Sequence, residues 1–192
     1  MVSNDREYRS FEMRVADGDM KVEGYAAIFD SPTVLYSYDG VDYKEEIART
    51  AFERSEMQDV VMNYNHQGKP VARTKNGTLE LNVDERGLYI RANLSGTEEG
   101  RRLYEEIKGG YIDKMSFAFT VSEDSYDRDT HTRRVLAIHR LYDVAAVDIP
   151  AYDATSISAR SYFSAEAEKV KQAEARVQQK IRKTKLLLEV MK

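Results

Sequence analysis

Strict alternation of apolar residues with small or polar ones runs through Met115-Ser116-Phe117-Ala118-Phe119-Thr120-Val121. Successive side chains of a β-strand point to opposite faces, so this period of two predicts a strand with one large apolar face and one face of small residues. A helix would instead need apolar residues at spacings of three and four. We therefore take this stretch as a central strand of a sheet.

The same period of two recurs on both sides of this stretch. It predicts further strands around Phe11–Val15, Gly24–Phe29, Leu79–Val83, Leu88–Leu94 and Val135–Ile149. The pair Asn76-Gly77, just before the third of these, is a β-hairpin signal. The polar stretch 122–132 is expected to be a connection between two strands.

Helical signals in this part of the chain are few. A capping-box pattern at Ser95–Glu98, apolar residues at Leu103 and Ile107, and the pair Gly109-Gly110 predict one short helix with both of its ends. A second short helix is expected over about Arg49–Met57. The fold class that follows is α+β, with a mainly antiparallel sheet or barrel and a few helices.

The C-terminal part of the chain differs in charge and in period. Residues 164–192 contain eight Lys or Arg and four Glu, a formal charge of +4, which leaves −8 on residues 1–163. Apolar residues recur there at helical spacing, at Val170, Ala173, Val177, Ile181 and Leu188. We expect an acidic domain over 1–163 and a basic amphipathic helical tail over 164–192.

Composition excludes several classes of protein. The 192 residues include no cysteine, which removes disulfide scaffolds and thiolate metal sites, and three histidines leave little for a histidine-rich metal centre. The net charge of −4 does not favour nucleic acid as a partner. The N-terminus is charged and no apolar run approaches the roughly 20 residues of a membrane span. We expect a soluble protein without a membrane partner, located in the cytoplasm.

His66 and Ser116 are the first candidates for chemistry. His66 ends the strand-like run 59–65, and Gly68 and Pro70 are expected to turn the chain after it. A histidine at a strand end beside a turn suits a general base, although a surface histidine fits the same pattern. Ser116 lies on the face of small residues, where a substrate could approach, but a nucleophile also needs a base within hydrogen-bond distance.

Asp143 is the third candidate. Its expected strand face is otherwise apolar, with Leu141, Ala145, Val147 and Ile149. A buried carboxylate needs a partner, and either a histidine or one of the many arginines would serve. His139, on the same expected face, is an alternative orienting group, whereas His131 lies in the polar connection and is expected to be solvated.

Residues 8–160 resemble the prohead maturation serine proteases of tailed phages. The matching motifs, in chain order, are Gly24-Tyr25-Ala26-Ala27-Ile28-Phe29-Asp30, the run 59–66 that ends in Asn65-His66, Pro70–Thr74 with Gly77-Thr78-Leu79, Asp84-Glu85-Arg86-Gly87-Leu88, residues 110–119 around Ser116, Leu141-Tyr142-Asp143-Val144, and Pro150-Ala151-Tyr152. The tail over 164–192 lies outside this resemblance.

The resemblance implies a fold like that of the herpesvirus assemblin proteases and a catalytic order of histidine, serine and third residue. His66 and Ser116 match the family's base and nucleophile. Asp143 stands where many members have Glu, and His139 remains the alternative third member because the assemblin relatives use a histidine.

The implied activity is that of a serine endopeptidase that cleaves the scaffold region of the major capsid protein and also itself, inside the assembling prohead in the host cytoplasm. No cofactor or metal is required, and self-association is an expected partner interaction. One alternative is a catalytically inactive capsid-assembly scaffold module on the same fold. Another is a metal-dependent hydrolase with His66, His131 and His139, which lack a short ligand spacing.

Overall fold

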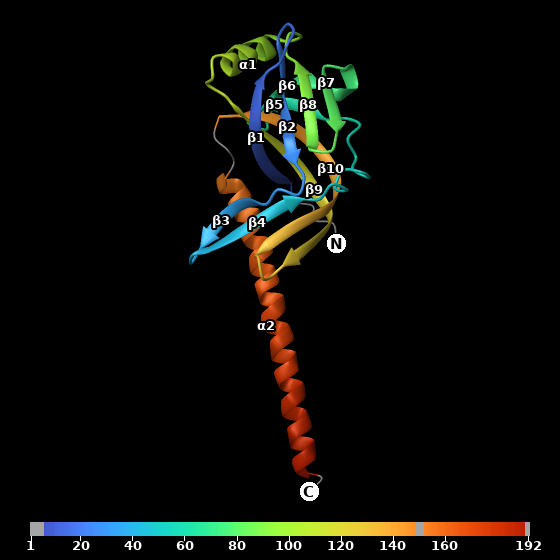
Figure 1. Cartoon of the computed structure of the whole chain (residues 1–192), viewed down its shortest axis with the longest axis vertical. Coiled ribbons are helices and arrows are strands. Elements are labelled where there is room, and N and C mark those ends of the chain that lie inside the picture. The colour runs from blue at the N-terminus through green and yellow to red at the C-terminus, as the bar shows by residue number, and fades with distance from the viewer. Residues whose placement is uncertain (1–5, 149–151, 191–192) are drawn as a thin grey trace. The chain divides into compact units, whose positions relative to one another are not determined.

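The computed structural model describes residues 6–148 and 152–190 (Figure 1). The elements in this part of the chain are β1 (Glu7–Val15), β2 (Lys21–Ile28), β3 (Thr33–Tyr38), β4 (Val41–Ile47), β5 (Val61–Tyr64), β6 (Gln67–Arg73), the 3-10 helix η1 (Thr74–Asn76), β7 (Leu79–Val83), β8 (Gly87–Asn93), α1 (Glu98–Lys108), β9 (Lys114–Asp127), β10 (Thr132–Val147) and α2 (Tyr152–Val190). The strands predicted by alternation are confirmed. Ile149 and Pro150, at the end of the last predicted strand, lie outside the described residues.

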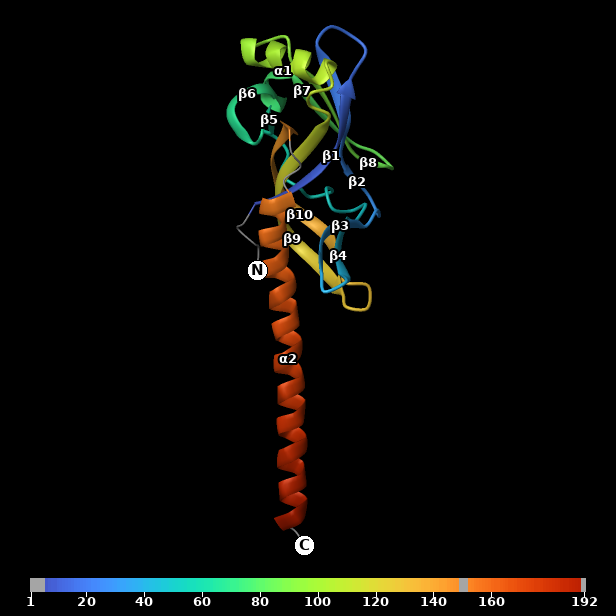
Figure 2. The same cartoon turned by 90° about the vertical axis from the view of Figure 1, so that its left-hand side faces the viewer.

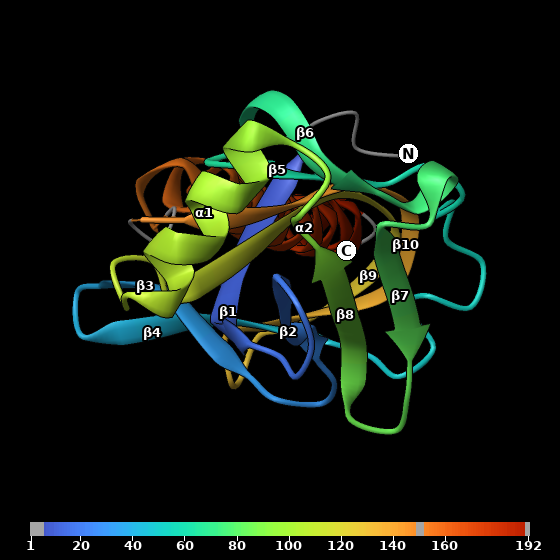
Figure 3. The same ribbon diagram turned by 90° about the horizontal axis from the view of Figure 1, so that it is seen from above.

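One mixed sheet contains all ten of these strands. Its main order is β3-β4-β10-β9-β1-β2-β8-β7, and β5 joins it through β10 and carries β6. Most pairs are antiparallel, while β4 and β5 pair with β10 in parallel. The sheet is not closed into a barrel, and β3–β4 and β7–β8 lie on opposite sides of its centre (Figure 3). The expected α+β class is confirmed, with an open mixed sheet.

Strand β9 lies in the middle of this sheet, between β10 and β1. Its residues 115–121 are all buried, so both of its faces are covered. Phe117 and Phe119 stack on each other with ring centroids 4.7 Å apart, on the expected apolar face. Leu103 and Ile107 of α1 are buried in the same core, and α1 lies at the opposite end of the sheet from β3–β4 (Figure 2).

The two predicted short helices have different outcomes. Helix α1 forms and stops at Gly109, but its N-cap is Thr97, whose side chain accepts a hydrogen bond from Gly100 N, so the predicted Ser95 cap is wrong. No helix forms over residues 49–57. Three successive bonds between residues three apart, such as Ala51 N to Ala48 O, make a series of turns there, without the four-residue spacing of an α-helix.

Two predicted connections are also wrong. The Asn76-Gly77 pair ends η1, with Gly77 at φ 72° as its left-handed cap, and it joins β6 to β7, which pair with other strands. Most of the polar stretch 122–132 belongs to β9 and β10, which continue as a long hairpin beyond the core. Polar composition signals exposure, and a hairpin whose backbone bonds are satisfied between its own strands can be exposed and still be regular.

A buried ion cluster joins four strands of the sheet. Arg9 of β1 donates to Glu45 of β4 at 2.5 Å and to Glu7 at 2.9 Å, and Arg133 of β10 donates to Glu7 at 2.6 Å, to Glu45 at 3.1 Å and to Asp124 of β9 at 2.6 Å. Four of these five residues are more than nine-tenths buried. Burial alone would raise the pKa of Glu7, but the charges and hydrogen bonds of Arg9 and Arg133 outweigh it and hold that pKa below its usual value.

The chain divides into two units, residues 1–156 and residues 157–192. The second consists of most of α2, a single helix of 39 residues that starts in the first unit. Val177 and Ile181 on the predicted stripe are about half exposed, at 54% and 45%. The side chain of Leu188 lies outside the described residues. Within the described residues, no helix is both long enough and apolar enough to cross a membrane.

Candidate active site

A β-bulge in β10 decides where the Asp143 side chain lies. Leu141 pairs with Phe119 and Asp143 pairs with Ala118, so the three residues 141–143 lie opposite two residues of β9. Directly paired residues share a face, and Phe119 and Ala118 are on opposite faces of β9. Leu141 and Asp143 therefore lie on opposite faces, and the expectation that they share one is wrong, because the extra residue Tyr142 reverses the alternation.

After the bulge, Asp143 and Ala145 share the face of Ser116. Ala145 pairs directly with Ser116, and Asp143, which pairs with Ala118, is two residue pairs further along the same two strands. Such diagonal neighbours have Cα atoms about 7–8 Å apart. Asp143 is only 6% exposed, which confirms the expectation of a buried carboxylate.

His66 reaches this face from the tip of the β5–β6 hairpin. Tyr64 pairs with Gln67, so Asn65 and His66 are themselves the two-residue turn, with φ values of 50° and 57°. Positive φ at both central positions is the geometry of a type I′ turn, whose twist matches that of the strands. The turn was expected later, at Gly68 and Pro70, and that expectation is wrong because those residues belong to β6.

The structure brings His66 and Asp143 into direct contact. His66 Nδ1 and Asp143 Oδ1 are 2.5 Å apart, and both side chains are nearly buried, at 12% and 8% exposed. An ionised carboxylate only accepts hydrogen bonds, so Nδ1 is the donor in this contact, which leaves Nε2 as the ring nitrogen that can take a proton from a nucleophile. Of the two kinds of partner expected for the buried Asp143 carboxylate, a histidine or an arginine, the structure shows the histidine.

Ser116 is close to this pair in the sheet but closed off from solvent. Its side chain is 0% exposed, and its Oγ has no hydrogen-bond partner among the described residues. The expectation of an open approach to Ser116 is therefore wrong for this conformation. Hydrogen bonds of a catalytic serine are often long in the free enzyme and tighten when substrate binds, so the arrangement remains compatible with a nucleophile.

The other two histidines lie elsewhere. His139 occupies a second bulge of β10 and is exposed. His131 lies in the β9–β10 turn, where its Nδ1 is 2.9 Å from the hydroxyl of Tyr126; it is half-buried, so it is only partly exposed to solvent. Within residues 6–148 and 152–190, no group of three or more His, Asp or Glu side chains has the geometry to hold a metal ion.

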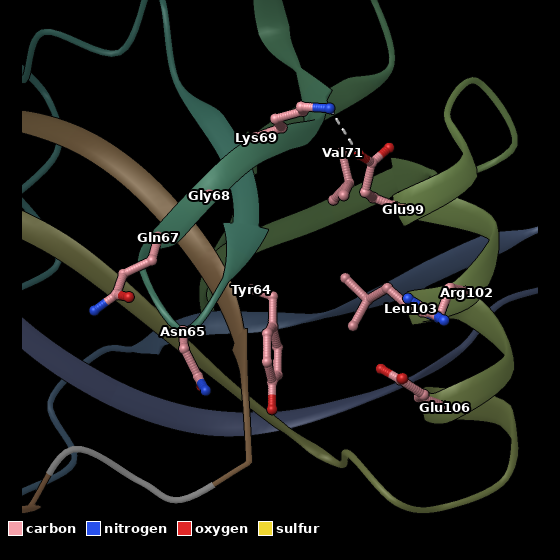
Figure 4. A pocket seen from close by; sticks show the side chains of 10 residues that line it. All are labelled: Tyr64, Asn65, Gln67, Gly68, Lys69, Val71, Glu99, Arg102, Leu103 and Glu106. Carbon is pink, nitrogen blue, oxygen red and sulfur yellow. Dashed lines mark hydrogen bonds and ion pairs between the residues drawn. The ribbon is translucent and has the colours of Figure 1, made fainter.

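A pocket of about 520 Å³ lies between the β5–β6 hairpin and α1 (Figure 4). Val71 and Leu103 form its buried apolar part, and the ion pair between Lys69 and Glu99, 3.1 Å apart, lies at its rim. Tyr64 stands in its middle and is adjacent in β5 to Asn63, so it lies on the other face of the sheet from Ser116. The pocket shares the hairpin of His66 but not the face of Ser116.

Sequence reasoning missed two residues that shape this site. Tyr142 creates the bulge, and nothing in an apolar run reveals where an extra residue lies. Asn63 of β5 pairs with Ala145, which pairs with Ser116, so these three residues form one row on one face. A signal for Asn63 was available, because it is a polar residue that directly follows the apolar run 60–62.

Comparisons with known proteins found a matching family and a similar solved structure. The model of the caudovirus prohead serine protease family matches residues 7–190. No curated protein matches the sequence. Among solved structures, the bacteriophage T4 capsid assembly protease, gp21, is similar with a TM-score of 0.51 and 15% identity, over 77% of this chain and 100% of that one; at this identity the likeness shows the fold.

The family match also corrects one expectation. It continues through residue 190, so the segment 164–190 lies inside the family resemblance and not outside it. The match spans nearly the whole chain, and it includes the hairpin of His66, the strand of Ser116 and the bulge before Asp143. The chain therefore belongs to the caudovirus prohead serine protease family.

Proposed function

We propose that this protein is a serine endopeptidase in which Ser116 is the nucleophile, His66 its general base and Asp143 the group that orients His66. The observation that carries the proposal is the hydrogen bond between His66 Nδ1 and Asp143, formed on the same face of the sheet as Ser116. Membership of a family of prohead serine proteases supports the proposed type of enzyme.

In the proposed mechanism, Ser116 Oγ attacks the carbonyl carbon of the scissile peptide bond while His66 Nε2 takes the hydroxyl proton. Asp143 stabilises the imidazolium that forms. When the tetrahedral intermediate collapses, His66 gives the proton to the leaving amine and the acyl group stays on Ser116. Water, deprotonated by His66, then hydrolyses this ester and restores the free enzyme.

The proposed substrates are the scaffold region of the major capsid protein and the chain itself, inside the prohead assembling in the host cytoplasm. The support is the family of prohead proteases to which the chain belongs. Because Ser116 is fully buried, a peptide carbonyl reaches Oγ only after the groups that cover it move. We therefore expect cleavage to depend on the state of assembly.

Alanine substitutions test the catalytic pair. Co-expression with the capsid protein and mass spectrometry should show defined cleavage products for the parent, and none for Ser116→Ala or His66→Ala, a loss on the order of 10⁴-fold or more. The double variant should be little worse than either single one, because the two residues act as a unit. Ser122→Ala, an exposed serine on the same strand, is the matched control and should cleave normally. Cleavage that persists in Ser116→Ala would refute the proposal and favour an inactive scaffold module contaminated by another protease.

We further propose that residues 164–192 deliver the protease to the scaffold and are later removed by self-cleavage. The half-exposed Val177 and Ile181 offer an apolar contact, and the +4 charge suits an acidic helical partner. Truncation before Ser164 should leave hydrolysis of a peptide substrate intact and reduce the amount of protease packaged in proheads, measured by immunoblotting of purified particles. Normal packaging would refute the delivery role, and lost hydrolysis would place the helix within the catalytic fold.

A further inference from the structure

Asn63 presents a buried polar group beside the candidate nucleophile that the mechanism above does not use. It is 7% exposed, and its Oδ1 is buried without a hydrogen-bond partner among the described residues. Burial of an amide oxygen without a partner costs free energy, so native structures rarely retain such a group unless something else pairs with it. An unpaired acceptor in a binding site is available to a ligand.

Strand register places Asn63 on the catalytic face. Asn63 pairs with Ala145 across β5 and β10, and Ala145 pairs with Ser116 across β10 and β9. Two strand spacings separate the Cα atoms of Asn63 and Ser116, about 10 Å. The residue between them is alanine, whose side chain is a single methyl group. Asn63 Oδ1 and Ser116 Oγ, both buried and both without a partner in the described part of the chain, therefore share one row.

We propose that Asn63 Oδ1 accepts a hydrogen bond from a backbone N–H of the bound substrate and so positions the polypeptide for attack by Ser116. The inference rests on the proposed function and adds a substrate-positioning residue to it. Any polypeptide offers a backbone N–H, and an acceptor in this place holds the chain without selecting a side chain. An extended segment advances about 3.3 Å per residue, so a 10 Å separation places this N–H within about three residues of the scissile bond.

A double-mutant cycle between enzyme and substrate tests the contact. Peptides that span a mapped cleavage site carry a single backbone N-methyl group at each position in turn, which removes one N–H at a time. They are measured with the parent, with Asn63→Leu, similar in size but without an acceptor, and with Asn63→Asp, which keeps an acceptor oxygen. Thr120→Val is the control, because Thr120 is a buried residue of the same face whose hydroxyl also lacks a partner but lies four residues from Ser116.

For the parent, we expect an N-methyl group at one position within three residues of the scissile bond to raise KM about tenfold. For Asn63→Leu, we expect the KM for the unmodified peptide to be about tenfold higher than that of the parent, and the same N-methyl group to raise it no further. Asn63→Asp and Thr120→Val should respond to that N-methyl group as the parent does. The melting temperature of Asn63→Leu should equal or exceed that of the parent, since the substitution removes an unpaired buried group.

Different outcomes overturn parts of the proposal separately. One such outcome is a parent that cleaves while Asn63→Leu shows an unchanged KM. Another is that the effect of every N-methyl group is additive with the effect of Asn63→Leu. In either case Asn63 does not contact the substrate backbone, and the proposed serine-protease function is unaffected. If the parent fails to cleave, or cleavage survives Ser116→Ala, the proposed function fails and the role of Asn63 fails with it. If Asn63→Leu does not fold, the N-methyl scan with Asn63→Asp takes its place. An N-methyl group that raises KM for the parent but not for Asn63→Asp would refute the role of Asn63 as a hydrogen-bond acceptor.

Discussion

Asp143 shows how one residue fixes the chemistry of another. Its carboxylate accepts the hydrogen bond of His66 Nδ1 at 2.5 Å, so the ring is held in the tautomer whose Nε2 can take a proton. Asparagine has the same shape, but its amide can also donate to Nδ1, which would favour the opposite tautomer. The charge that stabilises the imidazolium would be lost as well.

At this scale we predict that Asp143→Asn lowers kcat/KM on the order of 10³–10⁴-fold, whereas His139→Gln leaves it within a few-fold of the parent. His139 is exposed in a separate bulge, and Asp143 is the residue bonded to His66. Asp143→Glu should keep part of the activity, because the charge remains. Steady-state kinetics on a capsid-derived peptide makes the comparison. An inactive His139→Gln with an active Asp143→Asn would make a histidine the third member.

The β5–β6 hairpin is the element that presents His66. Its two-residue turn requires a left-handed backbone at Asn65 and at His66, which non-glycine residues rarely adopt. Asparagine is among the residues that tolerate this region, and the Asn65 N–H also donates to Ala146 O at 2.9 Å, which ties the turn to β10. The first turn position therefore holds a residue that suits its backbone conformation, whereas the second holds His66, whose proposed catalytic role explains an otherwise unfavourable conformation.

At the scale of this element we predict that Asn65→Gly retains most activity and stability, because glycine adopts positive φ freely. Asn65→Val should lower the free energy of unfolding by about 1–2 kcal/mol and reduce kcat/KM, since a β-branched residue resists this conformation and His66 would move. Denaturant unfolding and peptide kinetics measure both effects. Asn82→Val, at an exposed position of strand β7, is the matched control and should change neither. Equal behaviour of the valine and glycine variants would show that the turn does not position His66.

Across the whole molecule, the buried cluster of Glu7, Arg9, Glu45, Asp124 and Arg133 connects β1 and β4 to the β9–β10 hairpin, which is far from both in the sequence. Removal of one arginine leaves the buried carboxylates of Glu7 and Glu45 with a single cationic partner, so a buried member of this cluster contributes more to stability than a member of an exposed pair. The pKa of Glu7 is depressed in the folded chain, although burial acts to raise it, because Arg9 and Arg133 together outweigh burial. Glu7 therefore contributes stability above its unfolded pKa of about 4.3, and this is lost as pH falls through the folded value.

For this cluster we predict that Arg133→Met lowers the free energy of unfolding at pH 7 by about 3–5 kcal/mol. Arg73→Met removes an exposed pair with Asp59, at 2.6 Å, and should cost only about 0–1 kcal/mol. Glu7→Gln should also be less stable than the parent at pH 7, and the difference should shrink as pH falls below about 4. Denaturant unfolding over pH 3–8 measures this. A difference that stays constant down to pH 3 would mean that Glu7 does not titrate as a paired carboxylate.

Much of the fold followed from the sequence because alternation is a local property. Residues 115–121 alternate strictly, and the structure has them as a buried strand with the predicted faces. The order of motifs from Gly24 to Asp143 was enough to indicate the family that the family match then showed. His66 and Ser116 were singled out from their positions beside such strands. Local pattern failed where tertiary context competes with it, as in the turns over 49–57 and the exposed hairpin of β9 and β10.

The sequence by itself determined the strands with regular alternation, though not β3, β4 or β6, together with the short helix α1, a helix in the C-terminal part of the chain and the candidates His66, Ser116 and Asp143. Only the tertiary structure decided that Asp143 faces Ser116 and bonds His66, and that Asn63 lies in the row of Ser116. The physical reason is that a side chain's face depends on the parity of residues along a strand, and one extra residue in the pairing reverses it. Pairing between β5 and β10 joins residues more than eighty positions apart, such as Asn63 and Ala145, and no local pattern of residues encodes that register.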